Sequence, residues 1–409
     1  VGGPGRGKTA SATLMGVLAG YSIQDVRRAI QKGQPQMTVA DLLGSPLPAD
    51  MVKAQKLDDI GIGWRKWLGM RVKIVDEYNR IPTRTQSALL TIMADNYAEV
   101  FDQTYQCPDA AWYLTANDDA GGGTYQVIEA LRDRIDIVVK ALHFNTRFLG
   151  DLLLRIESGV KPEEIVPAQI VFTEEELDQM YRSVMQVRVP APLLRRLEFF
   201  ASQFEFCDHA ASQLEYKTKD TAKLSSLDWN LVASLDTGKD KTKDIGAQTQ
   251  NGLSVRSLMT ILTFVKAMAY FRGSREVEIE DVRQMIPFVL HDKLKQDVDC
   301  PYFESADNSS LRMDKISWIR RLFDASCAEY ERLNLDRDDP VATLAAQFEL
   351  GLEGVSQAEV RKRLVAIEKV LTQWSKSRKF YGHMFDDVLK LKYLHQRYTN
   401  YLRWLEWKK

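Results

Sequence analysis

The 409-residue sequence contains no long apolar run. A helix that crosses a bilayer needs about 20 consecutive apolar residues, and no run approaches that length. The chain also lacks the charged opening followed by an apolar stretch that marks a secretion signal. We therefore expect a protein without a membrane span that works in the cytoplasm.

Cysteine is scarce, and charge of neither sign is in excess. The four cysteines lie far apart with no C-x-x-C spacing, which favours buried reduced thiols over a disulfide framework or a zinc site. Lys and Arg number 55 against 56 Asp and Glu, a balance that argues against chain-wide electrostatic binding to nucleic acid or anionic membrane. With 45% hydrophobic residues, the chain has enough apolar material for two or three packed domains.

A glycine-rich loop opens the chain. It fits the pattern GxxxxGK[ST], and helix-compatible residues follow where the pattern requires a helix to begin. Glycines let backbone N–H groups point at phosphate oxygens, Lys8 would reach the β- and γ-phosphates, and the Thr9 hydroxyl would ligate Mg²⁺. The alternative is a glycine-rich turn before an ordinary helix, with a chance match on the order of one per cent. The loop comprises Gly2, Gly3, Pro4, Gly5, Arg6, Gly7, Lys8 and Thr9.

A strand that ends in two carboxylates forms the second motif. Residues 72–75 are largely β-branched and lead into Asp76 and Glu77, the arrangement of a Walker B motif. Asp76 would hold Mg²⁺, and Glu77 would orient and deprotonate the attacking water. In isolation such an acidic pair is usually a solvated helix cap. Downstream of a phosphate loop it instead indicates an α/β P-loop NTPase with a parallel sheet that uses ATP and Mg²⁺.

The residues around the second motif resemble the MoxR family of AAA+ ATPases. Residues 76–82 read DEYNRIP and residues 85–90 read TQSALL, where the family typically shows DEINR, then Pro, then a helix that begins TQSALLEAM. Tyr78 stands where Ile is usual. The resemblance spans roughly residues 1 to 295. It implies a homo-oligomeric ring, a hexamer, in which ATP hydrolysis reshapes a protein partner. Such rings commonly act with a von Willebrand factor A protein and help to mature complexes or to insert metal ions.

The same resemblance assigns roles to four polar residues. Asn117 matches sensor 1, whose amide both donates and accepts hydrogen bonds; alone it would be read as a strand-end Asn in a turn. Arg134, or Arg132 two residues earlier, matches the arginine finger that enters a neighbour's active site. Without the family context a surface salt bridge is the better interpretation. Arg256 matches the sensor 2 arginine of the lid, with a solvent-facing Arg at a helix start as the alternative.

These motifs divide the chain into an α/β core, an all-α lid and a C-terminal α-helical extension. The first core strand is expected upstream of Val1, because a phosphate loop normally follows a buried strand and the chain opens without Met. The second core strand is expected near Arg27 to Gln31. The predicted segments are the AAA+ core 1–145, a linker 146–170, the lid 171–295 with a polar insertion 207–251, and a helical bundle 296–409.

Three features lie outside the motifs. The insertion 207–251 is interpreted as a tolerated surface loop, with a docking site as the alternative. Trp64 and Trp67 are interpreted as packing residues on one helix face rather than pore residues. A helical stripe near the C-terminus predicts bundle core, with a coiled-coil seam as the alternative. Its members are Val360, Leu364, Ile367, Leu371 and Trp374.

The C-terminal segment is also locally basic. Residues 356–409 hold thirteen Lys and Arg against five Asp and Glu, interleaved with tyrosines and tryptophans. Such a surface suits single-stranded nucleic acid, and it equally suits an amphipathic helix that docks on another subunit. The sequence favours the second interpretation.

Two other functions stay open beside the remodelling ring. One is a nucleic-acid motor of a restriction or defence system, which salt-dependent DNA binding and DNA-stimulated hydrolysis would support. The other is a nucleotide-gated scaffold that turns over little ATP, against which intact Lys8, Thr9, Asp76 and Glu77 speak.

Overall fold

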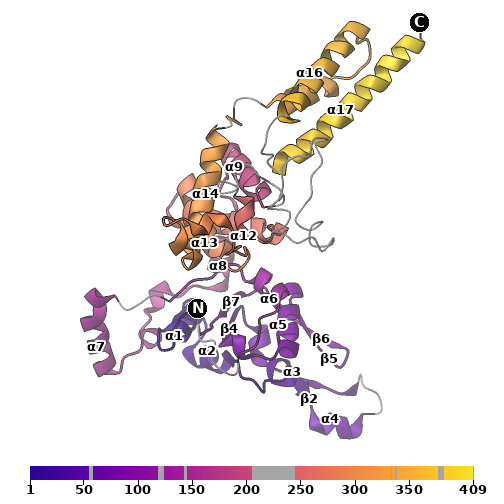
Figure 1. The fold of residues 1–409 in the computed structure, drawn as a ribbon. Helices are drawn as coiled ribbons and strands as arrows, with labels where there is room; N and C mark the ends of the chain where they lie inside the picture. Colours follow the sequence, from indigo (N-terminus) through magenta and orange to yellow (C-terminus); the bar gives the residue numbers. More distant parts are fainter. Residues whose placement is uncertain are drawn as a thin grey trace. The chain divides into compact units, whose positions relative to one another are not determined.

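The structure divides into two compact units, Val1–Gln186 and Val187–Lys409. The domain limits predicted from the motifs, at residues 145 and 171, both fall inside the first unit. Figure 1 shows the computed structural model, which describes residues 1–54, 59–117, 124–141, 145–204, 245–332, 334–336, 339–375 and 382–408.

The first unit is built on a parallel sheet in the order β1-β4-β7. Alternation along β4 places Val72 and Ile74 on one face, where Ala12 packs with them. Val75 lies on the other face in a second cluster that includes Leu89. Because the three strands are parallel, their carboxyl ends meet at one edge of the sheet. The strands are β1 (Gln31–Lys32), β4 (Val72–Asp76) and β7 (Ala111–Leu114).

The second core strand begins later than the sequence predicted. Residues 27–29 belong to α2 (Ile23–Ala29), and β1, which pairs with β4, begins only at Gln31. The helix starts at an N-cap, because the Ser22 side chain accepts a hydrogen bond from the Asp25 backbone N–H. The prediction of a strand at Arg27 is therefore wrong.

Helices and two short hairpins surround this sheet (Figure 1). The hairpins are β2 (Gly44–Pro46) with β3 (Ile62–Trp64), and β5 (Tyr97–Val100) with β6 (Gln103–Gln106). The remaining α-helices of the unit are α1 (Lys8–Leu18), α3 (Val39–Leu43), α4 (Pro48–Lys53), α5 (Thr83–Asp95), α6 (Glu129–Arg134), α7 (Leu149–Ser158) and α8 (Glu174–Met185).

Trp64 and Trp67 both pack inside the first unit. Trp67 is buried, and its indole N–H donates to the Leu42 carbonyl at 2.7 Å. The Trp64 ring centroid lies 5.5 Å from that of Tyr105. The interpretation of both residues as packing residues is confirmed. The prediction that they share one helix face is wrong, because Trp64 ends β3 and Trp67 lies in a short 3-10 helix.

The second unit is helical. Four helices pack together around buried side chains such as Phe200, Trp318 and Phe323. A second group of three helices forms the C-terminal bundle. The first four are α9 (Ala191–Ser202), α12 (Val255–Phe271), α13 (Ile279–Leu290) and α14 (Lys315–Arg332), and the bundle consists of α15 (Pro340–Glu349), α16 (Gln357–Ser375) and α17 (Gly382–Trp407).

The predicted C-terminal stripe is bundle core. Val360 and Ile367 are fully buried, and they cluster with Leu391 and Tyr398 of α17. Most of the predicted insertion 207–251 lies outside the described residues; only its last part, from residue 245, is described. Within the described part of the chain, no helix is long and apolar enough to cross a membrane.

Candidate active site

The glycine-rich loop has the backbone shape that its sequence demands. Gly2, Gly5 and Gly7 have positive φ values of 142°, 71° and 74°. This backbone region is unfavourable for residues with a Cβ atom but not for glycine. A Cβ added at Gly3, Gly5 or Gly7 would meet nothing within 4 Å. The loop runs directly into α1, which begins at Lys8. The open space therefore lies at a helix N-terminus, where backbone N–H groups and the helix dipole favour an anion.

Lys8 connects this loop to the strand ends. Its Nζ donates to the Gly3 carbonyl at 2.9 Å, to the Gly2 carbonyl, and to Asn117 Oδ1 at 2.7 Å. Asn117 Nδ2 donates in turn to Glu77 Oε1 at 2.6 Å. Asn117 thus uses both halves of its amide, between the loop lysine and the carboxylate that we predicted as the base. Only neutral acceptors hold the ammonium group in these three hydrogen bonds.

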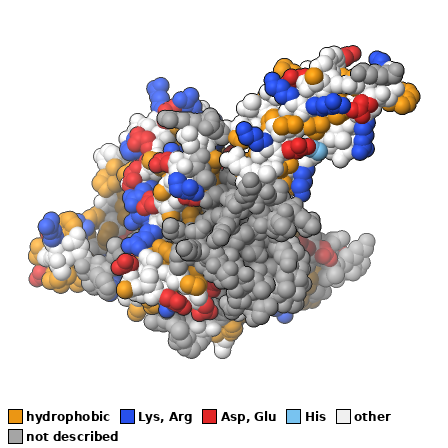
Figure 2. Space-filling view, turned by 45° about the horizontal axis from the view of Figure 1, so that its top comes forward, with side chains coloured by type: hydrophobic (Ala, Val, Ile, Leu, Met, Phe, Trp, Pro, Cys, Tyr) orange, Lys and Arg blue, Asp and Glu red, His pale blue; other side chains and the backbone are white. Residues whose placement is uncertain are grey.

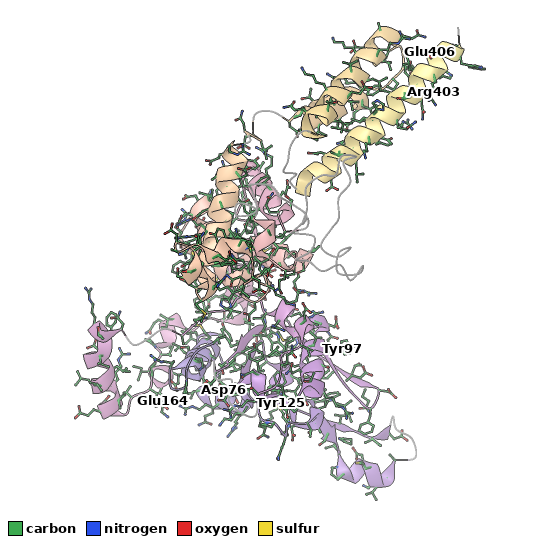
Figure 3. All side chains as sticks on the ribbon, in the orientation of Figure 1. Asp76, Tyr97, Tyr125, Glu164, Arg403 and Glu406 are labelled. Atoms are coloured by element: carbon green, nitrogen blue, oxygen red, sulfur yellow. The ribbon has the colours of Figure 1, made fainter. Side chains whose placement is uncertain are left out.

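Thr9 and Asp76 meet as the metal prediction requires. The Thr9 hydroxyl donates to Asp76 Oδ1 at 2.7 Å, and Asp76 lies at the end of β4 (Figure 3). A hydroxyl and a carboxylate are hard oxygen donors of the kind that Mg²⁺ prefers. Next to an anion-binding helix start, this donor set fits a nucleotide phosphate with Mg²⁺.

Two further residues hold the carboxylates and were missed in the sequence. The Thr115 hydroxyl donates to Asp76 Oδ1 and accepts from the Glu77 backbone N–H at 3.0 Å. Arg80 Nε lies 3.3 Å from Glu77 Oε2. The sequence does place both residues next to the motifs. Thr115 stands two residues before Asn117, just after β7, and Arg80 follows Glu77 by about one helical turn. Both side chains restrict the orientation of the acidic pair.

The backbone of Glu77 has an unusual conformation and is contacted by the residue that follows β1. Its φ is 54°, in the left-handed region that few non-glycine residues adopt. The Gly33 backbone N–H donates to the Asp76 carbonyl at 2.7 Å. A Cβ added at Gly33 would lie 2.3 Å from the Glu77 carbonyl oxygen and 2.9 Å from its carbon. The close approach of the two backbones therefore requires glycine at position 33.

Gly33→Ala should lower ATP turnover by about 10²-fold and leave ATP affinity within a few fold. The new methyl group displaces the Glu77 backbone, and a shift of about 1 Å in a catalytic group costs roughly that factor. Phosphate release and nucleotide titration on the same preparation measure the two effects. Gly150→Ala is the matched control, because a Cβ there meets nothing within 4 Å. Turnover of Gly33→Ala within twofold of wild type would show that the backbone contact does not position Glu77.

The two arginines predicted as finger candidates lie outside this cluster. Arg132 and Arg134 are on α6, partly exposed. In the described part of the chain, no hydrogen bond or ion pair joins either of them to the residues around Asp76; the Arg132 Nε is buried without a hydrogen-bond partner. Arg256 belongs to the second unit, in the first turn of α12, and is exposed. Their roles as finger and sensor stay predictions.

Comparison with known families places these elements. Residues 1–137 match the family model described as ATPase family associated with various cellular activities (AAA), and residues 243–309 match the AAA lid domain. The chain is 26% identical over 225 residues to Chaperone MoxR1 of Mycobacterium tuberculosis. The core and the lid of this chain are thus similar to those of MoxR-type AAA+ ATPases. The AAA match contains every motif residue from Gly2 to Arg134, and the lid match contains Arg256.

The MoxR resemblance covers only part of each protein. The match to the mycobacterial chaperone covers 54% of this chain and about half, 50%, of the relative's length. A crystal structure of a suspected ATPase from Cytophaga hutchinsonii aligns with a TM-score of 0.51 and 18% identity, over 78% of this chain and 83% of that one. The latter similarity shows the AAA+ fold alone. Residues 310–409 lie beyond both family models.

Proposed function

We propose that this MoxR-type chain binds ATP with Mg²⁺, hydrolyses it, and as a ring uses the hydrolysis to remodel a protein partner. The proposal that the chain binds and hydrolyses ATP rests on one observation. Five residues form a single cluster at the carboxyl edge of the sheet: Lys8, Thr9, Asp76, Glu77 and Asn117. Each residue type supplies one need of phosphoryl transfer: a cation, metal ligands, a base and a polar group that positions it.

The chain's own residues divide the work as follows. The loop N–H groups and Lys8 bind the phosphates, because the loop leaves open space at Gly3, Gly5 and Gly7 and leads into the N-terminus of α1, where Lys8 begins the helix. Thr9 and Asp76 would hold Mg²⁺, which supplies neutralisation of the charge that develops during phosphoryl transfer. Glu77 orients the attacking water and accepts its proton. Asn117 and Arg80 hold the two Glu77 oxygens, so the base needs little reorganisation when the substrate binds.

The assembly is inferred from the family. In the proposed ring, Arg134 of one copy, or Arg132, reaches the nucleotide of its neighbour, and Arg256 of the lid reads the γ-phosphate. The partial exposure of Arg134 at the end of α6 supports this role. The mycobacterial relative is named a chaperone, which supports a protein substrate, and we propose that a von Willebrand factor A protein acts with it.

Glu77→Gln protein should assemble into a ring when ATP is added. The substitution keeps the phosphate-binding loop but slows hydrolysis, so the bound state accumulates. Light scattering should give about six times the 46.7 kDa of one chain, whereas Lys8→Ala protein with the same ATP should stay smaller because it lacks the phosphate contact. Monomeric mass for Glu77→Gln at saturating ATP would contradict the ring.

A further inference from the structure

The outer face of α17 is the strongest surface that the proposed ATPase activity does not use. The apolar side of this helix is already covered by α15 and α16: Leu391, Leu394 and Tyr398 are between 0% and 2% exposed. An amphipathic docking helix would need that apolar side for its partner. The side left in solvent is the opposite one, and apart from Leu389, which is 50% exposed, it is polar and aromatic.

Three aromatic rings lie on this side. Tyr393, Trp404 and Trp407 are 54%, 44% and 83% exposed. At 3.6 residues per turn, they point within about 60° of one another. From Tyr393 to Trp407 the helix rises about 21 Å, a length that spans several nucleotides. We call the exposed residues on and beside this line the basic-aromatic face: Lys390, Lys392, Tyr393, Arg397, Arg403, Trp404, Trp407 and Lys408.

The charge of the face has one sign. Five of its residues are cations, and Glu406 is the only acidic residue from Val388 to the end of the chain. That carboxylate is paired with Arg361 of α16 at 3.1 Å. Arg403 lies on α17 close to Glu406 in sequence (Figure 3). In the space-filling view, Lys, Arg and hydrophobic side chains lie side by side on the α16–α17 hairpin, with some Asp and Glu among them (Figure 2). The face is thus complementary to a polyanion.

Cations accompany the rings. Lys408 Nζ lies 4.9 Å from the Trp404 ring centroid, and Arg397 Cζ lies 6.0 Å from that of Tyr393. An acidic peptide would use the cations and leave the three rings in water. A single-stranded nucleic acid uses both, because its phosphates meet the cations while its bases stack on the rings.

We propose that the basic-aromatic face of α17 binds single-stranded nucleic acid through phosphate contacts and base stacking. The face lies beyond both family models and shares no residue with the ATP site. The proposal therefore goes beyond the proposed function and stands or falls separately from it.

The test is fluorescence anisotropy on the full-length protein with labelled oligodeoxythymidylate and oligouridylate of about 20 nucleotides, at salt from about 50 to about 200 mM. Wild type should bind at low salt. Trp407→Ala with Tyr393→Ala should weaken binding at least about tenfold, because stacking contributes about 1–3 kcal/mol per base. Lys392→Glu with Arg403→Glu should weaken binding and flatten its salt dependence.

The matched control is Lys53→Glu with Arg84→Glu, an equal charge change at two exposed positions of the first unit, which should leave binding within twofold. Unchanged circular dichroism and ATP turnover show that each variant is folded. The proposal is overturned if wild type binds neither oligonucleotide at low salt, or if binding survives the α17 changes. Binding of polyglutamate that depends on the cations but not on the rings would instead identify an acidic protein segment as the occupant.

Discussion

Glu77→Gln should reduce ATP turnover by about 10²–10⁴-fold, the usual contribution of a general base, while ATP still binds. Glutamine keeps the size of the side chain and can still accept the hydrogen bond from Asn117, but it cannot take the proton of the attacking water. The phosphate-binding loop and Lys8 are untouched, so affinity should change little. Phosphate release and titration with a fluorescent nucleotide give the two numbers.

Glu99→Gln is the control for that substitution, since Glu99 is an exposed glutamate on β5 of the same unit. It should hydrolyse ATP at the wild-type rate. Wild-type turnover by Glu77→Gln would instead mean that another group deprotonates the water, and the assignment of the base would be wrong.

Arg134→Ala should bind ATP nearly normally yet lose about 10³-fold or more in turnover, the effect of losing an arginine finger. The positive charge of the guanidinium persists at neutral pH, and its fork meets the transition-state charge on the phosphoryl oxygens. In the proposed ring the arginine acts on a neighbouring copy, so the defect belongs to the interface between two chains. Steady-state phosphate release of the assembled variant measures the loss.

Mixed rings separate action within a chain from action between chains. Arg134→Ala and Glu77→Gln copies are each inactive alone, but a mixed ring contains interfaces at which an intact Glu77 faces an intact Arg134. Activity should therefore return on mixing. No recovery in rings shown to be mixed would contradict action between chains. Full activity of Arg134→Ala, with loss in Arg132→Ala, would move the finger to Arg132.

The site could be predicted from sequence as far as its chemistry is local. The loop needs glycines, Lys8 and Thr9 at fixed spacing, and Asp76 and Glu77 end a strand, so each motif is visible in a short stretch. Asn117 was identified through the family resemblance, and its contact with Lys8 and Glu77 arises because the parallel strands β4 and β7 end at one edge of the sheet.

The rest depends on contacts between distant segments. Gly33 matters because β1 and β4 place it against the Glu77 backbone, and an isolated glycine after a short strand gives no sign of this. The structure places α8 in the first unit, where Arg71 lies 2.6 Å from Asp178 of that helix. No local sequence pattern predicts an ion pair between residues so far apart in the chain. Likewise, Lys73 stands mid-strand but is 1% exposed, with its Nζ bonded to the Met70 carbonyl at 2.6 Å.

Phosphate release by the purified wild-type chain tests the central claim most directly. The claim is that Lys8, Thr9, Asp76, Glu77 and Asn117 form one ATP-hydrolysing site. It predicts steady turnover that needs Mg²⁺, stops on chelation, and is absent from Lys8→Ala protein, which should also fail to bind ATP. No turnover by assembled wild-type protein with Mg²⁺, or equal turnover by Lys8→Ala, would contradict it.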